Sequence, residues 1–212
     1  PTAPRRMAVL DPIELVIENY PEGKSEKLTI ANNAENEALG TREITFSKHV
    51  YIERDDFAIV PPPKYKRLSP EKEVRLMGAY IVKCTGYETD EEGNVTRVLC
   101  TYDEDSASGT GGRKVKGVLH WVDKNTAVDA EVRLYENLVL EGEGDFTQRI
   151  NPNSLSVRHA KVEASLSDAA VQDSFQFIRI GYFCADPDGK PGAPVFNRSV
   201  GLKDSWAKQV KK

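Results

Sequence analysis

The sequence lacks the patterns of membrane-spanning and secreted proteins. No apolar run approaches the ~18–20 residues that a helix needs to cross a bilayer, and the opening residues before Met7 contain no apolar stretch of a signal peptide. There is no initiator Met, and the first apolar segment begins abruptly at Met7. We therefore expect a cytoplasmic protein without membrane contact, and a segment or processed domain of a longer chain.

Cysteine is scarce, and metal-ligand spacing is missing. The three cysteines, Cys84, Cys100 and Cys184, are an odd number without CxxC spacing, which indicates neither a disulfide framework nor a zinc site. Adjacent acids at 55–56 and 103–105 lack the spacing of cation ligands and are typical of solvated turns. We expect buried thiols and no metal site.

Motifs of catalysis are also absent. The sequence contains no Gly-rich phosphate loop, no HExxH and no nucleophile elbow. The three histidines, His49, His120 and His159, are scattered singly. His120 lies between Leu119 and Trp121, so a strand would place it on the opposite face, hydrogen-bonded or facing solvent. We predict no catalytic residue in this chain.

What is present is strand periodicity, in a chain of 212 residues that is long enough for two small domains. Alternation of apolar and polar residues recurs along the whole chain and predicts at least six strands. The alternating apolar residues are Ile44, Phe46, Val50 and Ile52; Val74, Leu76, Tyr80, Val82 and Cys84; Val115, Leu119 and Trp121; Val132, Leu134, Leu138 and Leu140; and Phe175, Phe177 and Phe183.

Turn formers separate these segments, and helical patterns are short. The best helical candidates are residues 53–57 and 165–171, where Ser165 or Ser167 could cap the first turn. We therefore predict an all-β fold of antiparallel sheets with a few short helices, closed as barrels or packed as sandwiches. From the residues alone, the Gly-rich loop 106–112 is the most natural boundary between two β units.

The charge is unevenly distributed. The net charge is −4, which by itself argues against nucleic-acid binding. Residues 61–83, however, hold six Lys or Arg against two Glu, a local charge of +4. Within this stretch Lys66 and Arg67 offer donors for phosphates and base edges, and Tyr65 offers a stacking face. A solvated strand face is the alternative interpretation of this stretch.

A second group of donors lies at 176–179. Gln176 can donate and accept at a base edge, whereas Arg179 is a forked donor. Arg179 shares strand parity with Phe175 and Phe177, so it must emerge at a strand end or find partners inside. An internal ion pair of Arg179 therefore remains open beside a role in binding.

Several ordered segments resemble the C-terminal anticodon-binding region of the glutaminyl-tRNA synthetases. The resemblance covers residues 5–208 and implies two antiparallel β-barrels, with the distal barrel inserted into the proximal one. It assigns residues 1–18 and 117–212 to the proximal barrel and residues 19–116 to the distal barrel. The matching segments, in family order, are RRMAVLDP at 5–12, LVIENY at 15–20, FS at 46–47, YKRL at 65–68, KEVRL at 72–76, GRKVKGVLHWV at 112–122, GYFC at 181–184 and VFNR at 195–198.

The resemblance also implies seven anticodon-binding residues. By position, Arg5 and Gln176 match residues that recognise the middle uracil of the glutamine anticodon. Arg67 and Lys66 match residues that hold the third base and its phosphate, and Arg75 matches a contact of the first base. The full set is Arg5, Lys64, Lys66, Arg67, Arg75, Gln176 and Arg179.

Three positions depart from the family pattern. Met77 stands where some members carry a second arginine, Lys64 replaces a glutamine, and Ile178 stands where a glutamate can occur. Because the Ile178 change removes an acceptor, the imide hydrogen of the uracil needs another partner. Recognition of the first base and the hydrogen bonds to the middle base are the features that these changes affect.

The resemblance implies a glutamine-tRNA ligase region whose partners are the tRNA for glutamine and its own catalytic domain, in a monomer. ATP and Mg²⁺ would belong to that catalytic domain, which this chain lacks, so the chain alone should have no cofactor and no aminoacylation activity. Two alternatives are the matching region of an archaeal or eukaryotic-type glutamyl-tRNA synthetase and a non-enzymatic β-barrel module that binds protein through its edge strands.

Overall fold

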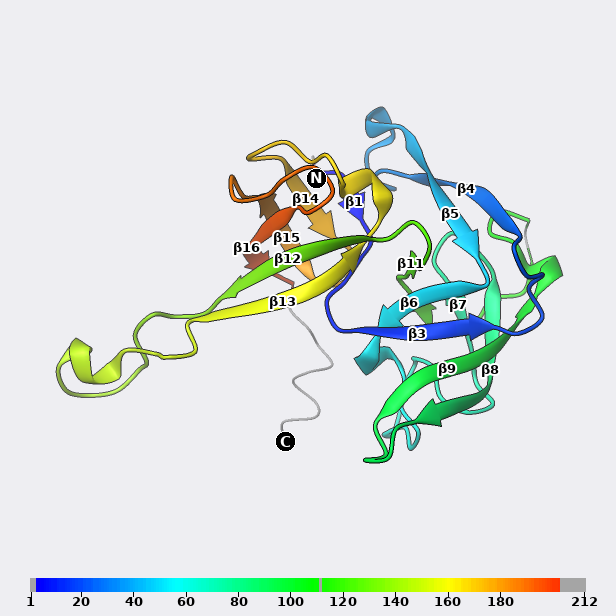
Figure 1. The fold of residues 1–212 in the computed structure, drawn as a ribbon, viewed down its shortest axis with the longest axis horizontal. Helices are drawn as coiled ribbons and strands as arrows, with labels where there is room; N and C mark the ends of the chain where they lie inside the picture. The colour runs from blue at the N-terminus through cyan, green and yellow to red at the C-terminus, as the bar shows by residue number, and fades with distance from the viewer. Residues whose placement is uncertain (1–2, 111, 203–212) are drawn as a thin grey trace.

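The computed structural model describes residues 3–110 and 112–202. In this part of the chain, sixteen strands form two seven-stranded sheets and one two-stranded ribbon, and the helices are short 3₁₀ turns (Figure 1). The prediction of an all-β fold with a few short helices is confirmed. The part of the resemblance that covers 203–208 lies outside the described residues.

The first sheet is built from the two ends of the chain. Its strands lie in the order β1-β14-β15-β16-β12-β13-β2, with parallel pairing of β1 to β14 and of β12 to β16. The bounds are β1 Arg5–Arg6, β2 Ala8–Val9, β12 Val128–Tyr135, β13 Leu155–Val162, β14 Ser174–Phe177, β15 Gly181–Ala185 and β16 Val195–Gly201.

The second sheet is built from the middle of the chain. Its order is β10-β7-β8-β9-β3-β6-β11, again with two parallel pairs, β10 to β7 and β3 to β9. The bounds are β3 Pro12–Ile17, β6 His49–Glu53, β7 Glu73–Leu76, β8 Ile81–Thr89, β9 Val95–Asp103, β10 Val118–Leu119 and β11 Val122–Asp123.

Both sheets curl toward a closed barrel in the same way. The edge strands of the first sheet, β1 and β2, are consecutive in the chain and separated only by Met7. The edge strands of the second sheet, β10 and β11, are likewise consecutive and separated by His120 and Trp121. One short interrupted strand therefore bridges the two edges of each sheet, which produces the barrel-like shape and leaves few open edges.

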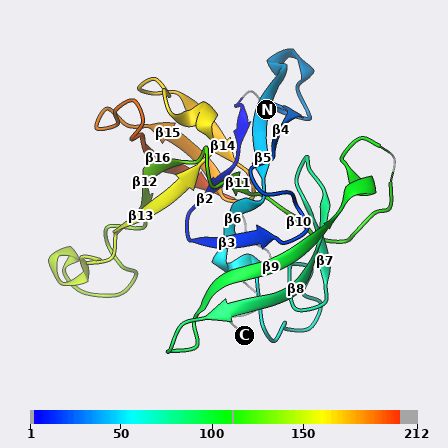
Figure 2. The same ribbon diagram turned by 45° about the vertical axis from the view of Figure 1, so that its right-hand side comes forward.

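A two-stranded ribbon and five 3₁₀ helices complete the described part of the fold. The ribbon pairs β4 (Ser25–Ala31) with β5 (Thr41–Ser47) and stands beside the second sheet (Figure 2). The helices are η1 Glu37–Leu39, η2 Arg54–Asp56, η3 Glu104–Ser106, η4 Phe146–Arg149 and η5 Ala164–Leu166.

The two helical predictions correspond to η2 and η5, each a single turn of three residues. The predicted caps are wrong, because Glu163 is the N-cap of η5 and makes no side-chain cap bond. Ser165 instead donates from its hydroxyl to the Glu163 carboxylate.

Each sheet encloses its own core, as the alternation predicted. In the core beside the second sheet, Trp121 meets Phe46 of the ribbon edge to face at 5.2 Å, and Tyr20 meets Phe46 at 5.3 Å. In the first sheet Phe177 stacks on Phe183 at 4.3 Å. These aromatic residues are almost completely buried, so they supply much of the apolar area that each barrel removes from water.

Three alternating residues are not core residues. Strand β12 ends at Tyr135, and Leu138 and Leu140 beyond it are 66% and 50% exposed. Val115 lies outside the strands, because the second sheet resumes only at Val118. Periodicity alone does not show whether an alternating segment has a second layer to pack against.

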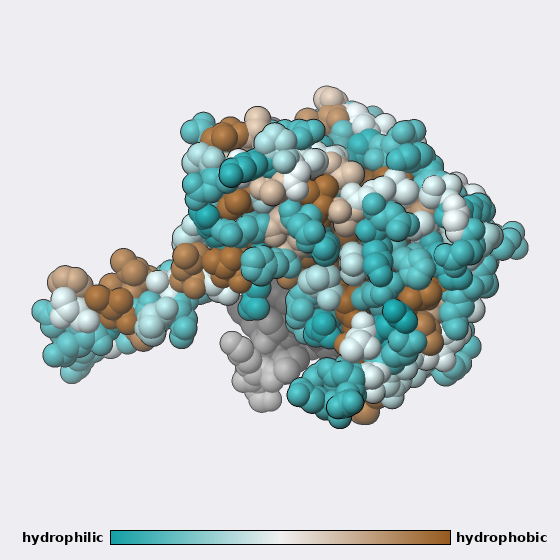
Figure 3. All heavy atoms as spheres, viewed as in Figure 1, coloured by the Kyte–Doolittle hydropathy of each residue, from teal (hydrophilic) through white to brown (hydrophobic). Residues whose placement is uncertain are grey.

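Residues 136–154, between β12 and β13, form a hairpin arm that projects from the body of the molecule (Figures 1 and 3). Figure 3 shows apolar side chains on the surface of the arm. The side chains of Phe146 and Ile150, both in the arm, are 61% and 53% exposed. The arm contributes no residue to either buried core cluster.

The segments of the sheets differ from the predicted barrel boundaries. Strand β3, within the predicted proximal segment 1–18, pairs with β6 and β9 of the second sheet, and β10 and β11 belong there too. The chain crosses between the sheets at residues 9–12 and returns at 123–128. The physical reason is burial, because Ile13, Leu15 and Ile17 of β3 pack into the core that contains Trp121.

The remaining sequence predictions concern thiols and membrane contact. Cys84 and Cys100 are buried and unpaired by disulfides, as predicted, whereas Cys184 is partly exposed. Within residues 3–110 and 112–202, no helix is long and apolar enough to cross a membrane.

Candidate nucleic-acid interface

A basic groove of about 480 Å³ lies between residues 61–73 and 114–117. Its only acidic lining residue among those described, Glu73, is bound in a forked pair by Arg113 at 2.6 and 3.0 Å, and the hydrogen bonds from Arg113 lower the pKa of Glu73. The groove therefore carries a strong positive charge on a protein whose net charge is −4. Its cationic lining residues are Lys64, Lys66, Arg67, Lys72, Lys114 and Lys116.

Unusual backbone positions shape this groove. Lys64 has a φ of +63°, a left-handed conformation that non-glycine residues seldom adopt and that is enriched at functional sites. Gly117 lets the two walls approach, because a Cβ there would lie 2.1 Å from the Lys66 carbonyl oxygen. Tyr65 donates from its hydroxyl to the Asp55 carbonyl at 3.0 Å, and burial raises the pKa of Tyr65 to about 12.

Arg67 connects the groove to the other sheet through one carboxylate. Its Nε lies 3.3 Å from Oδ1 of Asp56, whose side chain is fully buried. Arg179, in the turn between β14 and β15, binds the same carboxylate with both Nη atoms, at 2.6 and 2.8 Å. The structure thus brings Arg67 and Arg179 together, and the internal ion pair that the sequence left open for Arg179 is present.

Arg5 and Gln176 also lie together, as the resemblance implied. They are register partners in the parallel pair β1 and β14, and Arg5 Nε donates to Gln176 Oε1 at 3.0 Å. Arg5 Nη2 donates to the Glu35 carboxylate at 2.7 Å, and this hydrogen bond lowers the pKa of Glu35. Because Arg5 occupies the Gln176 oxygen, the pair presents mainly N–H donors, with Glu35 as the neighbouring acceptor.

Arg75 is tied to a neighbouring loop. Of the seven predicted residues, Lys64, Lys66 and Arg67 line the groove, whereas Arg75, like Arg5, Gln176 and Arg179, does not. Its Nη1 donates to the carbonyl oxygens of Ser106 (2.6 Å) and Ala79 (3.2 Å) and to the Ser108 hydroxyl (3.3 Å). In this structure Arg75 holds the loop after η3 against β7, and its predicted contact with the first base stays a prediction.

His120 lies at the junction of the two sheets and not at the surface. It is buried, with Nδ1 3.4 Å from Arg179 Nη1 and Nε2 3.5 Å from Glu53 Oε1. The Glu53 carboxylate also accepts from the backbone N–H groups of Leu10 and Asp11 at 2.8 and 3.0 Å. Burial opposes ionisation of Glu53, but His120 and these two N–H groups outweigh it and lower its pKa.

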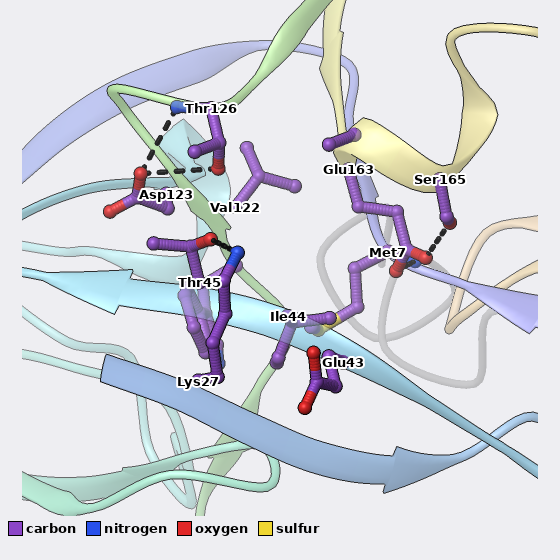
Figure 4. A pocket seen from close by; sticks show the side chains of 12 residues that line it. Met7, Lys27, Glu43, Ile44, Thr45, Val122, Asp123, Thr126, Glu163 and Ser165 are labelled. Atoms are coloured by element: carbon purple, nitrogen blue, oxygen red, sulfur yellow. Dashed lines mark hydrogen bonds between the residues drawn. The ribbon is translucent and has the colours of Figure 1, made fainter. Parts of the chain in front are cut away.

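A smaller pocket of about 90 Å³ lies between β5, β11 and η5 (Figure 4). The Glu163 carboxylate in its lining accepts from the Met7 N–H at 2.9 Å and from Arg42 at 2.6 and 2.8 Å. Lys27 donates to the Thr45 hydroxyl at 2.7 Å.

The described residues contain no group of three or more His, Cys, Asp or Glu that could hold a metal ion. Sequence reasoning did not select Lys114, Lys116 or Asp56. Lys114 and Lys116 lie in the segment 112–122 that resembles the family, and they form a short basic stretch. Only the fold places that stretch across the groove from Lys66. Asp56 gave no signal beyond an adjacent acid, because its partner Arg179 is far away in sequence.

Comparison with known proteins places these residues in one family. Two models with the description "tRNA synthetases class I (E and Q), anti-codon binding domain" match residues 3–103 and 118–186. The glutamine-tRNA ligases of Clostridium perfringens and Alteromonas mediterranea are each 54% identical to this chain over 97% of its length. That of Aliivibrio fischeri is 52% identical over 97%. The chain spans 38–39% of the length of these curated relatives.

Proposed function

This chain belongs to the family of anticodon-binding domains of the class I glutamyl- and glutaminyl-tRNA synthetases, and from that membership we propose that it binds the anticodon loop of the tRNA for glutamine. The basic groove at 61–73 and 114–117 carries the proposal, because six cationic side chains line it against one paired acid. Lysine and arginine side chains along the path of an RNA strand neutralise its phosphates. The unpaired bases of a loop can be splayed apart and bound at their edges.

The third anticodon base is assigned to Arg67. By the genetic code, glutamine anticodons end in guanine and glutamate anticodons end in cytosine, while both have uracil in the middle. A guanidinium fork matches the two acceptors of guanine and contributes about 1–3 kcal/mol of discrimination against another base. Arg67 lines the groove beside Lys66, which would hold the adjacent phosphate. This chemistry favours the glutamine branch over the glutamate branch.

The middle uracil is assigned to Arg5 and Gln176. Their N–H donors suit the two carbonyl oxygens of uracil, which flank its imide N–H. Ile178 cannot accept that hydrogen, but the Glu35 carboxylate lies 2.7 Å from Arg5 Nη2 and supplies an acceptor next to the pair. Glu35 would therefore serve where a glutamate at 178 can occur in the family.

The activity of the whole protein is proposed from its relatives. The curated relatives are named glutamine-tRNA ligases, and the chain covers 38–39% of their length. We place ATP, Mg²⁺ and aminoacylation in a catalytic domain outside this chain, joined to it in a cytoplasmic monomer. The role of this region is then to select the tRNA.

The test is binding of this chain to anticodon stem-loops, measured by filter retention across a salt titration. We expect the glutamine stem-loop to bind more tightly than one in which the third base is cytosine, and the affinity to fall as salt rises. Tighter binding of the cytosine stem-loop would favour the glutamate branch. Binding that is absent or insensitive to both salt and sequence would contradict the proposal and favour a protein-interaction module.

A further inference from the structure

Asp56 is a fully buried carboxylate that two arginines of different sheets share. It ends η2, which follows β6 of the second sheet, and its side chain is 0% exposed. Arg179 reaches it from the first sheet with two hydrogen bonds, Nη2 to Oδ1 at 2.6 Å and Nη1 to Oδ2 at 2.8 Å. Arg67 approaches the same Oδ1 with Nε at 3.3 Å.

The main chain fixes this arrangement on both sides. The Leu68 N–H donates to the Asp56 carbonyl at 2.9 Å, and Phe57 and Leu68 form a β-bridge, so Arg67 is held beside η2. Arg179 has a φ of +69°, a strained conformation that persists only where tertiary contacts stabilise it. The carboxylate provides such a contact.

A shared oxygen makes the two guanidinium groups dependent on each other. A bidentate carboxylate pair is planar and specific in orientation, and in a buried place its strength depends steeply on geometry. If Arg179 shifts, Oδ1 shifts its hydrogen bonding and charge toward Arg67, and the reverse also holds. Arg179 lies three residues after Gln176, which pairs with Arg5, whereas Arg67 lies in the groove.

We propose that Asp56 is a positioning residue that couples recognition of the middle anticodon base to recognition of the third base. This inference rests on the proposed function of the groove and of the Arg5–Gln176 pair. A wrong middle base displaces Arg179, Asp56 then turns its hydrogen bonding and charge toward Arg67, and Arg67 is drawn out of the orientation that matches the third base. Substitution of both bases therefore weakens binding less than the product of the two single effects.

The coupling is measured with four stem-loops, which carry the glutamine anticodon, a substituted middle base, a substituted third base, or both substitutions. Dissociation constants are determined by fluorescence anisotropy at one fixed salt concentration for the unchanged chain. We expect the product of the two single losses to exceed the double loss by about fivefold or more, the range of typical coupling between sites.

The variant Asp56→Asn keeps the shape of the side chain but loses its charge and the two-armed pairing. In this variant we expect the product of the single losses to agree with the double loss within about twofold. Asp55→Asn is the matched control, because it removes the same charge from the adjacent exposed residue, and it should keep the coupling. A purely structural role of Asp56 would weaken all four complexes by one factor and leave the coupling as it was.

Each remaining outcome refutes either the role of Asp56 or the proposed function. If the unchanged chain distinguishes both bases but shows no coupling, or if Asp56→Asn retains it, the role of Asp56 is refuted and the proposed function stands. If neither base affects binding, the proposed function fails first. If Asp56→Asn does not fold, as thermal unfolding would show, Arg179→Lys replaces it, since lysine keeps the charge without the fork. Coupling that survives in Arg179→Lys overturns the inference.

Discussion

Arg67 is the residue at which the groove and the ion pair between the sheets meet. It lines the groove, approaches Asp56 with Nε at 3.3 Å, and donates from Nη1 to the Asp55 carbonyl at 3.3 Å. Its neighbours Lys64 and Lys66 are exposed, whereas Arg67 itself is partly buried. Such anchoring lowers the entropy that the side chain loses on binding a base and makes Arg67 the best placed donor of the groove.

Arg67→Ala should weaken binding of the glutamine stem-loop by about 1–3 kcal/mol, or roughly 5–150-fold, and reduce the preference for guanine at the third position. Stem-loop affinities measured with each of the four third bases check this. The control is Arg158→Ala, an exposed arginine on β13 outside the groove lining. An unchanged ranking of the four stem-loops would exclude Arg67 from base recognition.

Glu53 gives a prediction about pH. Its pKa is lower in the folded protein than its ordinary value of 4.5, because His120 and two backbone N–H groups outweigh the opposing effect of burial. A carboxylate with a lowered pKa stabilises the fold fully above its unfolded value and loses that contribution as pH falls through the folded value. The free energy of unfolding should therefore decrease below about pH 4.5.

In Glu53→Gln this decrease should be shallower than in the unchanged chain, because glutamine keeps an acceptor for Leu10 and Asp11 but does not titrate. Urea unfolding from neutral pH down to about pH 3 measures the slope. Glu91→Gln, at an exposed turn, serves as the control and should keep the original slope. Identical slopes in Glu53→Gln and the unchanged chain would rule out this contribution.

At the scale of elements, the groove depends on the contact between its two walls. The segment 114–117 reaches Lys66 because Gly117 has no side chain, and the Gly117 carbonyl accepts from the Arg75 N–H at 2.8 Å. The same arginine holds the loop after η3 through its guanidinium. The groove is thus a product of packing between β7, β10 and two loops, not of any single strand.

Gly117→Ala would place a methyl group 2.1 Å from the Lys66 carbonyl oxygen and 2.9 Å from a Val74 methyl group, so backbone must move. We expect a loss of stability on the order of 1–3 kcal/mol and weaker stem-loop binding through displacement of Lys66. Thermal unfolding and anisotropy measure the two effects. Gly201→Ala is the control, since its added Cβ meets no atom within 4 Å and, as at Gly117, its φ is not positive.

At the scale of the whole molecule, an acidic protein presents a cationic groove. The net charge is −4, yet six lysines and arginines line the basic groove. Phosphate binding needs a positive potential only on the facing surface, and the acidic remainder disfavours unspecific contacts with RNA. Affinity should accordingly depend on salt in proportion to the phosphates contacted.

Lys114→Ala combined with Lys116→Ala should reduce the salt dependence of stem-loop binding. For single strands the logarithmic slope changes by about 0.7 for each phosphate contact, so two lost contacts lower it by about 1.4. A salt titration of the double variant measures this change. Lys24→Ala with Lys190→Ala, two exposed lysines outside the groove lining, should leave the slope unaltered.

The sequence alone predicted the fold class and the basic stretch that lines part of the groove. Alternation marked the strands because one face of each must be buried, and it identified core residues such as Phe46, Trp121 and Phe177. The local charge of residues 61–83 pointed to the cations of the groove. The resemblance placed Arg5 beside Gln176, and the β1–β14 register agrees with that pairing.

Only the tertiary structure decided which distant segments meet. Two-residue strands such as β1 and β10 leave no periodic signal, yet they join the edges of each sheet. Arg179 and Asp56 are 123 positions apart, so no local pattern could pair them. Arg75 donates to the carbonyl of Ser106, a contact that strand periodicity does not show. Local sequence determines which residues are buried or charged, because that depends on side chains and their spacing. Which of them share a carboxylate or a groove depends on chain crossings, which only the folded packing fixes.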